Sequence, residues 1–307
     1  MRAARLHELG GTPRVDEVPE PAVVSGRGAG TAVVQAAVLE VSASALNPVD
    51  VSIGSGRFYG GAPELPYVIG SEAVGTTEDG RRLWCYDRGT MAERVAVVRP
   101  ERTVNVPEGV DDELALACGV AGVTAWLAVT WRARVTPEDT VLVLGASGTL
   151  GGTAVQASKL LGARRVVGAA RRVEAVPGEA DEAIRIDDGW EPPASTVIVD
   201  GLWGEPVERA LAAAAEGVRL VQLGQSAGPT ATLQSAWVRG KVARILGHSL
   251  FSTPPAVLAE GYRELCVHAR DGRIRFETET YGLDRIAEAW ERQASGSPGA
   301  KLVVTLR

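Results

Sequence analysis

The chain has 307 residues, and its 45% hydrophobic content is enough to bury the cores of two ordinary domains. A formal net charge of -6 argues against a nucleic-acid groove, because neutralising phosphates requires a basic surface. Without an uninterrupted apolar run of about 18 residues or an apolar leader at the start, we expect a cytoplasmic protein that does not enter a membrane. The three widely spaced cysteines fit reduced packing residues better than a disulfide framework.

Residues 1–115 are predicted to form a mostly β domain, because valine-rich runs at 32–41 and 93–98 alternate with glycine and proline clusters such as 54–67. Residues 116–252 then alternate apolar strands with helical stretches. The strands are predicted at 140–146, 164–170, 195–201 and 218–224, and the helices between them include 151–162 and 206–217. Each strand is too continuously apolar to have a wet face, which predicts a parallel sheet covered by helices on both sides.

Residues 253–307 return to the mixed pattern of the first domain. A strand is predicted at 273–282, an amphipathic helix at 283–295 and a last strand at 301–306. No internal repeat or low-complexity tract interrupts this organisation.

The first apolar strand of the alternating region runs into a glycine-rich turn, GASGTLG, and a helix follows it. This context is typical of a dinucleotide site, in which backbone N–H groups meet a pyrophosphate at the start of the helix. Ala146 stands where such turns usually have a first glycine, a side chain at Gly148 would block the approach, and Gly151 would let helix and strand pack closely. A tight turn with only a structural role is the alternative. The predicted contacts are Gly145, Ala146, Ser147, Gly148, Thr149 and Leu150.

The second strand ends at Ala170, where an NAD site usually offers a carboxylate to the ribose hydroxyls. Arg171 and Arg172 follow instead. Guanidinium groups pair with a 2′-phosphate that a carboxylate would repel, so the pair predicts a preference for NADPH. Two solvated arginines at a helix start are the alternative interpretation.

Several segments of the sequence together resemble a known family of enzymes. Five segments have the order and spacing of the medium-chain dehydrogenases/reductases, and they are most similar to its zinc-independent quinone oxidoreductase branch. The resemblance implies an α/β chain with a GroES-like partial β-barrel domain (1–115 and 253–307) and a Rossmann domain with a doubly wound parallel sheet (116–252), with the active site in the cleft. The segments are SASALNPVDVSIGSGRFYGGAPELPYVIGSEAVG (42–75), GTMAERVAV (89–97), LALACGVAGVTAW (114–126), GASGTLGG (145–152) and DRIAEAWERQASGSPGAKLVV (284–304).

The sequence departs from the zinc-using members of this superfamily, which hold catalytic zinc by a Cys, a His and a third residue. Asn47, Ser71 and Val120 occupy those positions, and Glu72 alone is not a site, because tetrahedral zinc needs at least three protein ligands. The lobe that holds a structural zinc in relatives has only Cys85. We therefore expect no metal.

Without a Lewis acid, a plain ketone is difficult to polarise, whereas hydride addition to a conjugated C=C–C=O system needs orientation and a proton source. We therefore expect an NADPH-dependent reductase of quinones or α,β-unsaturated carbonyls. Asn47 resembles the family's polar residue near the nicotinamide, where it would hold a ribose hydroxyl or a substrate carbonyl; a turn-forming Asn before Pro48 is the alternative. Phe58 takes the slot of the tyrosine acid of enoyl-thioester reductases, which leaves Tyr59 as the predicted proton donor and Tyr67 as a second candidate.

Further cofactor contacts are expected at the carboxyl ends of the strands, where ligands bind in open α/β sheets. The resemblance adds Thr124 beside the nicotinamide carboxamide, although a buried Thr that bonds its own helix backbone is the alternative. It also adds the loop 246–251. The predicted residues are Thr124, Asp200, Gly201, Leu223, Gly224, Gln225 and Ser249.

Residues 218–250 would supply the edge strand of the Rossmann sheet, and an apolar edge must be paired, charged or covered. Pairing with a second copy predicts a closed homodimer, as the resemblance also implies. If the segment TPPAVLAEGYRELC covered the edge, the chain would instead be a monomer. Two other functions stay open at this point: a specialised biosynthetic ene- or carbonyl reductase, and a sensor that binds NADPH without turnover.

Overall fold

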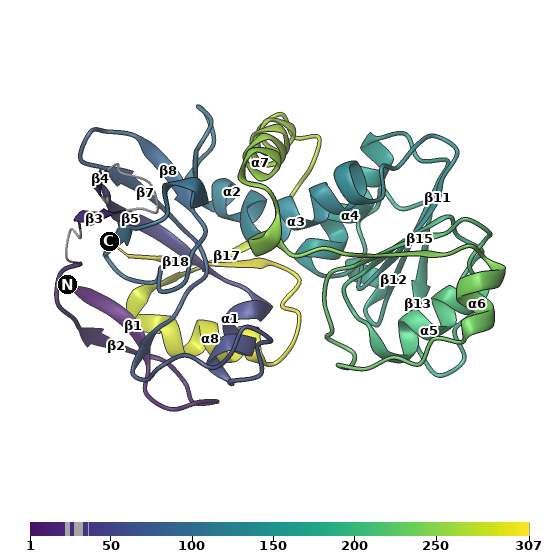
Figure 1. The fold of residues 1–307 in the computed structure, drawn as a ribbon, viewed down its shortest axis with the longest axis horizontal. Helices are drawn as coiled ribbons and strands as arrows, with labels where there is room; N and C mark the ends of the chain where they lie inside the picture. Colours follow the sequence, from purple (N-terminus) through teal and green to yellow (C-terminus); the bar gives the residue numbers. More distant parts are fainter. Residues whose placement is uncertain (22–24, 28–32, 36, 307) are drawn as a thin grey trace. The chain divides into compact units, whose positions relative to one another are not determined.

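A computed structural model of the protein describes residues 1–21, 25–27, 33–35 and 37–306 (Figure 1). The chain divides into two compact units. Unit 1 comprises Met1–Val120, Tyr262–Arg270 and Phe276–Arg307, and unit 2 comprises Ala121–Gly261 and Asp271–Arg275. Each unit has its own sheet and its own hydrophobic core.

Unit 1 is rich in strands that the two ends of the chain build together. Its larger sheet has the order β10-β8-β7-β5-β18-β17, and β9 also pairs with β5. β18 lies antiparallel to β5 with Leu302 opposite Leu46, so the C-terminal strand pairs with a strand from the first part of the chain. The strands are β1 (Arg2–Leu6), β2 (Arg14–Glu17), β3 (Ser25–Arg27), β4 (Val33–Gln35), β5 (Ala37–Leu46), β6 (Tyr67–Val68), β7 (Ala73–Thr77), β8 (Arg82–Cys85), β9 (Arg94–Val97), β10 (Thr103–Asn105), β17 (Thr278–Gly282) and β18 (Lys301–Thr305).

The core of unit 1 lies between its sheets and the amphipathic helix α8 (Ile286–Ala294). Alternate residues of β5 are buried, and apolar side chains of α8 such as Ala289 and Trp290 pack into the same cluster. Burial of this cluster stabilises the unit by roughly 25 cal/mol for each Å² of apolar surface removed from water. The unit also contains α1 (Pro48–Gly54) and α2 (Asp112–Ala117).

Unit 2 is built on a six-stranded sheet with the order β13-β12-β11-β14-β15-β16. Every neighbouring pair is parallel, as the uninterrupted apolar strands predict. The central strand β11 lies between β12 and β14, so the strand order reverses direction there, which is where open α/β sheets bind ligands. The elements are β11 (Thr140–Leu144), α4 (Thr149–Leu160), β12 (Arg165–Ala170), β13 (Glu182–Arg185), β14 (Val197–Asp200), α5 (Gly204–Ala213), β15 (Arg219–Gln222), α6 (Ser235–Gly240) and β16 (Arg244–Gly247), preceded by α3 (Thr124–Leu127) and followed by α7 (Pro255–Arg270).

Several predicted elements differ from those in the structure. The strand expected at 273–282 is only Thr278–Gly282, because the backbone of Arg275 exchanges hydrogen bonds with the amide of Gln156 on α4, at 2.8 and 3.0 Å. The short strand β13 was not predicted, since it carries few apolar residues. Within the predicted strand 32–41, Ala32 and Ala36 lie outside the described residues.

One helical run, Asp112–Arg132, is long and apolar enough by composition to cross a membrane. Its most apolar window is 78% buried within the protein, as in the core helix of a folded domain. The run bends at Gly119, whose ψ of -135° is not helical.

Candidate active site

The glycine turn after β11 has the geometry expected of a phosphate-binding turn. Gly145 has a φ of +82°, a left-handed conformation that favours glycine, and a Cβ at Gly151 would lie 2.2 Å from the Gly145 carbonyl oxygen. Gly148 is the N-cap of α4, so the N–H groups of the first helical turn have no acceptor within the helix. These N–H groups and the helix dipole make the turn a suitable cradle for a pyrophosphate.

Ala146 departs from the usual glycine without disturbing this turn. It is fully buried, and its methyl group lies next to Gly168 of β12, where an added Cβ would come within 3.0 Å of the Ala146 Cβ. The N–H groups of Gly145 and Ala146 both donate to the carbonyl of Ala169, at 2.8 and 3.1 Å. A glycine in the neighbouring strand therefore makes room for the alanine in the turn.

Arginines gather at the carboxyl end of β12. Arg171 and Arg172 directly follow the strand, and both are exposed. Arg185 at the end of β13 is paired in register with Ala170 and donates to the Arg171 carbonyl at 2.6 Å. Arg185 was missed from the sequence, because only the register of β13 brings it here. The edge thus offers three guanidinium groups, which are suited to a phosphate.

Asp200 ends β14 and is fully buried. Its Oδ1 accepts the N–H groups of Leu202 and Trp203, both at 2.9 Å, while its Oδ2 has no hydrogen-bond partner among the described residues. Burial raises the pKa of this carboxyl to about 6, and the two backbone N–H groups oppose the shift. One oxygen therefore holds the turn, and the other is buried without a partner among the described residues.

The turns after β14 and β15 are joined to each other. The N–H of Leu223 donates to the Asp200 carbonyl at 2.8 Å, and a Cβ at Gly224 would lie 2.8 Å from the Gly201 carbonyl oxygen. Gln225 lies in the exposed part of this loop. Since Gly145, Arg171, Asp200 and Leu223 all follow parallel neighbouring strands, the structure brings these predicted residues to one edge of the sheet.

Thr124 begins α3 and is buried, whereas Ser249 follows β16 and is half-buried. His248, between β16 and Ser249, is in contact with the backbone of Thr124, and burial together with the charge of Arg132 lowers its pKa to about 4. His248 is therefore a neutral imidazole at neutral pH, and it packs edge-on against Trp131 with a centroid distance of 5.9 Å. The sequence offered no signal for this histidine beyond its place in the predicted loop 246–251.

In unit 1, Asn47 is 2% exposed and lies in a buried polar cluster. Its Nδ2 donates to Oε1 of Glu72 at 2.9 Å, and its Oδ1 accepts from Nζ of Lys301 at 2.5 Å. Lys301 also contacts Oε1 of Glu72 at 2.6 Å. Asn47 is also the N-cap of α1 and forms a capping box with Asp50, so the turn as well as these two residues contacts it.

Asp50 completes the start of α1. Its Oδ2 accepts the backbone N–H of Asn47 at 2.8 Å, and its Oδ1 accepts the hydroxyl of Ser71. With the Asn47 side chain it forms a capping box, and Pro48 is the first helical residue, so a sequence signal for the unpredicted helix α1 was present. Burial raises the pKa of Asp50 to about 6, and hydrogen bonds from Ser71 and Asn47 and the charge of Lys301 oppose this shift.

The two tyrosine candidates differ in their surroundings. Tyr59 is 80% exposed, and its ring lies against Phe58 with a centroid distance of 4.3 Å. The hydroxyl of Tyr67 is buried without a hydrogen-bond partner in the part of the chain that the structure describes. Burial and the nearby charge of Asp50 raise the pKa of Tyr67, so its hydroxyl keeps its proton.

Among the described residues, no three His, Cys, Asp or Glu side chains are grouped as a metal would require. Ser71 bonds Asp50, and Asn47 bonds Glu72 and Lys301, so these side chains are engaged with protein groups. The residues present do not fit a tetrahedral zinc site, which needs at least three nitrogen, sulfur or oxygen ligands.

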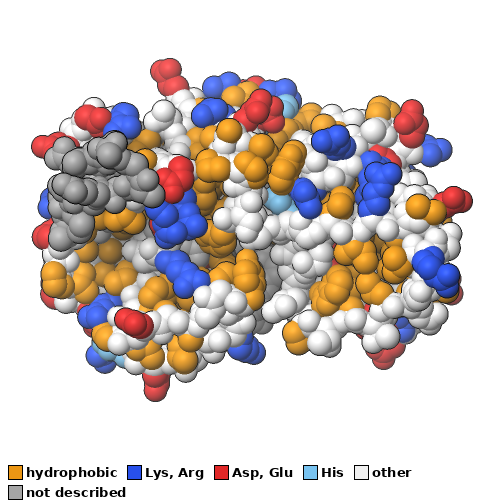
Figure 2. Space-filling model, in the orientation of Figure 1, with side chains coloured by type: hydrophobic (Ala, Val, Ile, Leu, Met, Phe, Trp, Pro, Cys, Tyr) orange, Lys and Arg blue, Asp and Glu red, His pale blue; other side chains and the backbone are white. Residues whose placement is uncertain are grey.

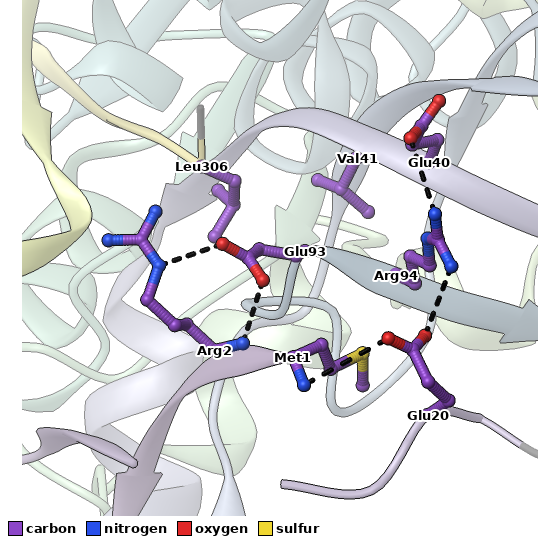
Figure 3. Close-up of a pocket in the computed structure, with 8 residues that line it drawn as sticks. All are labelled: Met1, Arg2, Glu20, Glu40, Val41, Glu93, Arg94 and Leu306. Atoms are coloured by element: carbon purple, nitrogen blue, oxygen red, sulfur yellow. Dashed lines mark hydrogen bonds and ion pairs between the residues drawn. The ribbon is translucent and has the colours of Figure 1, made fainter. Parts of the chain in front are cut away.

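A pocket of about 290 Å³ opens near the N-terminus of unit 1 (Figure 3). Its charged side chains contact each other: Arg2 bonds Glu93 at 2.8 Å, and Arg94 reaches Glu20 at 3.4 Å and Glu40 at 3.7 Å. None of the predicted site residues lines it. The charges of this pocket are therefore paired with one another, and it is not part of the candidate site. Its lining is Met1, Arg2, Glu20, Glu40, Val41, Glu93, Arg94 and Leu306.

Acidic and basic side chains both occur over the face of the molecule drawn in Figure 2, without a continuous basic band among the coloured residues. This agrees with the net charge of -6.

Comparison with known proteins places these features in context. No family model matches the chain. It is 28% identical, over 99% of its own length, to a phenolphthiocerol/phthiocerol polyketide synthase of Mycobacterium tuberculosis, but spans only 15% of that protein. It is 33% identical to the quinone oxidoreductase of Rattus norvegicus over 49% of this chain and 47% of the relative. The structure of the quinone oxidoreductase from Thermus thermophilus, studied with NADPH, matches with a TM-score of 0.82 and 29% identity over 100% of both chains.

Proposed function

Because the chain belongs to the medium-chain dehydrogenase/reductase superfamily, with quinone oxidoreductases among its relatives, we propose that it reduces a quinone or an α,β-unsaturated carbonyl with NADPH. The observation that carries this proposal is the carboxyl edge of the parallel sheet in unit 2. A phosphate-binding turn, three arginines and a buried carboxyl oxygen without a partner among the described residues meet along that edge.

These residues suit the parts of NADPH in turn. The N–H groups at the start of α4 would hold the pyrophosphate, and Arg171 and Arg172 would pair with the 2′-phosphate, with Arg185 beside them. Asp200 has a buried oxygen that would accept a ribose hydroxyl. Thr124 and Ser249 remain proposed contacts of the nicotinamide end, together with Leu223, Gly224 and Gln225.

When bound, NADPH supplies a hydride to the electron-poor carbon of the acceptor and becomes NADP⁺. The chain's own residues must orient the acceptor and deliver one proton to the reduced product. In this proposal Asn47 holds a ribose hydroxyl or the acceptor's carbonyl oxygen. In this proposal the protein thus contributes orientation of the acceptor and delivery of the proton.

The proton donor is proposed among Tyr59 and Tyr67. Tyr59 is in contact with solvent and can be reprotonated from it, whereas the buried Tyr67 hydroxyl has a raised pKa and gives up its proton only to a strongly basic oxygen or carbanion. Tyr59→Phe and Tyr67→Phe, each compared with the wild-type chain, should separate them, because only loss of the donor lowers kcat while NADPH binding stays unchanged.

The relative from Mycobacterium tuberculosis favours a second candidate, a biosynthetic ene reductase that acts on α,β-unsaturated thioesters, because that match covers 99% of this chain. A third candidate is a sensor that binds NADPH without turnover. The three are separated by mixing the full chain with NADPH and a panel of quinones, enones and enoyl thioesters, and following the loss of reduced-nicotinamide absorbance. Turnover with quinones or simple enones supports the first proposal, turnover restricted to thioesters supports the second, and binding without turnover of any acceptor refutes both.

We further propose a cytoplasmic homodimer formed through β16. This strand is at the end of the six-stranded sheet, and Ile245 in it is 42% exposed. Since an apolar edge is a liability when left open, a second copy related by a two-fold axis would pair both edges at once.

A further inference from the structure

The buried cluster around Asn47 contains an ion pair to which the proposed function assigns no task. Glu72 is fully buried and Lys301 is 2% exposed. They come from the ends of adjacent strands: Asn47 follows β5, Glu72 precedes β7, and Lys301 begins β18. A buried ion pair contributes little net stability compared with apolar residues of the same volume, so its presence calls for another role.

The carboxylate of Glu72 is fully engaged. Oε1 accepts from Asn47 and Lys301, and Oε2 accepts from Nε1 of Trp84 and from the backbone N–H of Val120, both at 2.8 Å. Gly119 makes this possible, because a Cβ there would lie 1.9 Å from Oε2 of Glu72. The carboxylate is thus held on both sides and is a rigid acceptor.

The chemistry of the two partners decides which way the Asn47 amide points. An ammonium group can only donate, so Lys301 must face Oδ1, and a carboxylate can only accept, so Glu72 must face Nδ2. The amide of Asn47 therefore has one orientation, which its two charged partners determine. Oδ1 also faces the backbone N–H of Asp50 in the capping box, so one Nδ2 hydrogen remains beyond these contacts.

We propose that Glu72 and Lys301 are positioning residues that fix the amide of Asn47, so that its remaining Nδ2 hydrogen meets the cofactor or the acceptor in a single arrangement. This inference rests on the proposed function, in which Asn47 contacts one of these ligands. Catalytic groups held by fixed neighbours gain rate through orientation, and a misplacement of about 1 Å can cost 100-fold. Glu72 and Lys301 themselves touch neither ligand in this proposal.

The test is a cycle of variants in the full chain. Glu72→Gln with Lys301→Met removes both charges together and keeps an acceptor for Trp84 and Val120. The introduced amide can now donate to Oδ1 of Asn47. The Asn47 side-chain amide is therefore expected to rotate so that its oxygen and nitrogen exchange places. The cycle contains the pair variant, Asn47→Ala and the combination of the two. For each of them kcat, KM and the NADPH dissociation constant are measured. Thermal unfolding checks that each variant is folded.

We expect the pair change to lower kcat by about 10- to 100-fold in the wild-type background. In the Asn47→Ala background it should change kcat by less than about 2-fold, because its effect passes through Asn47. A matched control neutralises Asp139 and Arg219, a largely buried pair at the other end of the strands of unit 2, by Asp139→Asn with Arg219→Met. This control should lower stability and leave kcat unchanged.

Equal losses of kcat in both backgrounds, or no loss in either, would overturn the positioning role. If the pair variant does not fold, Glu72→Gln alone enters the same cycle. If none of the acceptors in the panel supports NADPH oxidation by the wild-type chain, the proposed function fails. The cycle is then read on the NADPH dissociation constant, where additive losses reject the positioning role and non-additive losses support it.

Discussion

The preference for NADPH can be tested at the two arginines that follow β12. Replacing Arg171 and Arg172 by Ala removes the guanidinium groups proposed to pair with the 2′-phosphate. Two charged hydrogen bonds at about 1.5–3 kcal/mol each would together give about 3–6 kcal/mol. Both side chains are exposed, so solvent screening reduces the expected loss to about 2–4 kcal/mol, or about 30- to 700-fold in the dissociation constant.

The structure refines this estimate through Arg185. That residue bonds the backbone carbonyl of Arg171, which the substitution leaves in place, so Arg185 should remain near the phosphate and keep the loss toward the lower end. Adding Arg185→Ala should then increase the loss further. NADH lacks the 2′-phosphate, and its affinity should change by less than about 2-fold.

Fluorescence titration with NADPH and NADH at one ionic strength measures both constants. The control is Arg164→Ala with Arg165→Ala, two exposed arginines at the opposite end of β12, which changes the net charge equally. It should leave NADPH affinity nearly unchanged, because it removes no contact with the 2′-phosphate and alters only the long-range electrostatic attraction, which salt screens. Equal losses for NADPH and NADH, or equal losses in the two double variants, would refute the assignment of the 2′-phosphate to this edge.

Three further outcomes are expected. Because Asn47 and Ser71 are bonded to protein groups and no three His, Cys, Asp or Glu side chains are grouped among the described residues, elemental analysis should find no stoichiometric zinc, and a chelator should leave activity unchanged; zinc lost together with activity would contradict this. Ile245→Lys at the exposed edge of β16 should convert a dimer to a monomer in sedimentation at micromolar concentration, and a monomeric wild type would reject the dimer. Burial raises the pKa of Asp200 from its ordinary value of 3.8 to about 6. Its charged form therefore destabilises the fold above pH 6, and this destabilisation disappears as the pH falls toward 3.8. Asp200→Asn should therefore stabilise the chain by up to about 3 kcal/mol near pH 8 and by little near pH 4 in urea unfolding, and a difference that does not vary with pH would argue against the shift.

The parts of unit 2 that were predictable depend on short-range patterns. Uninterrupted apolar strands separated by helices require a parallel sheet, and the turn from Gly145 to Gly151 requires glycine for its backbone and its close packing. Arg185 could not be predicted, because its place beside Arg171 depends on the register of a short charged strand. Likewise, nothing local to Ala146 shows that Gly168 in the next strand leaves room for its methyl group.

The Asn47 cluster shows a stronger limit of sequence reasoning. Lys301 lies 254 residues from Asn47 along the chain, and a lysine at the start of an apolar strand is ordinarily read as a solvated end. Only the antiparallel pairing of β18 with β5, which sets Leu302 opposite Leu46, brings its ammonium to the Asn47 amide. An amide whose type alone says little in the sequence is therefore held in one orientation by the fold. The residue type alone does not show which of its atoms is available to a ligand. In related chains one must therefore also identify the charged side chains that strand pairing brings next to such a residue.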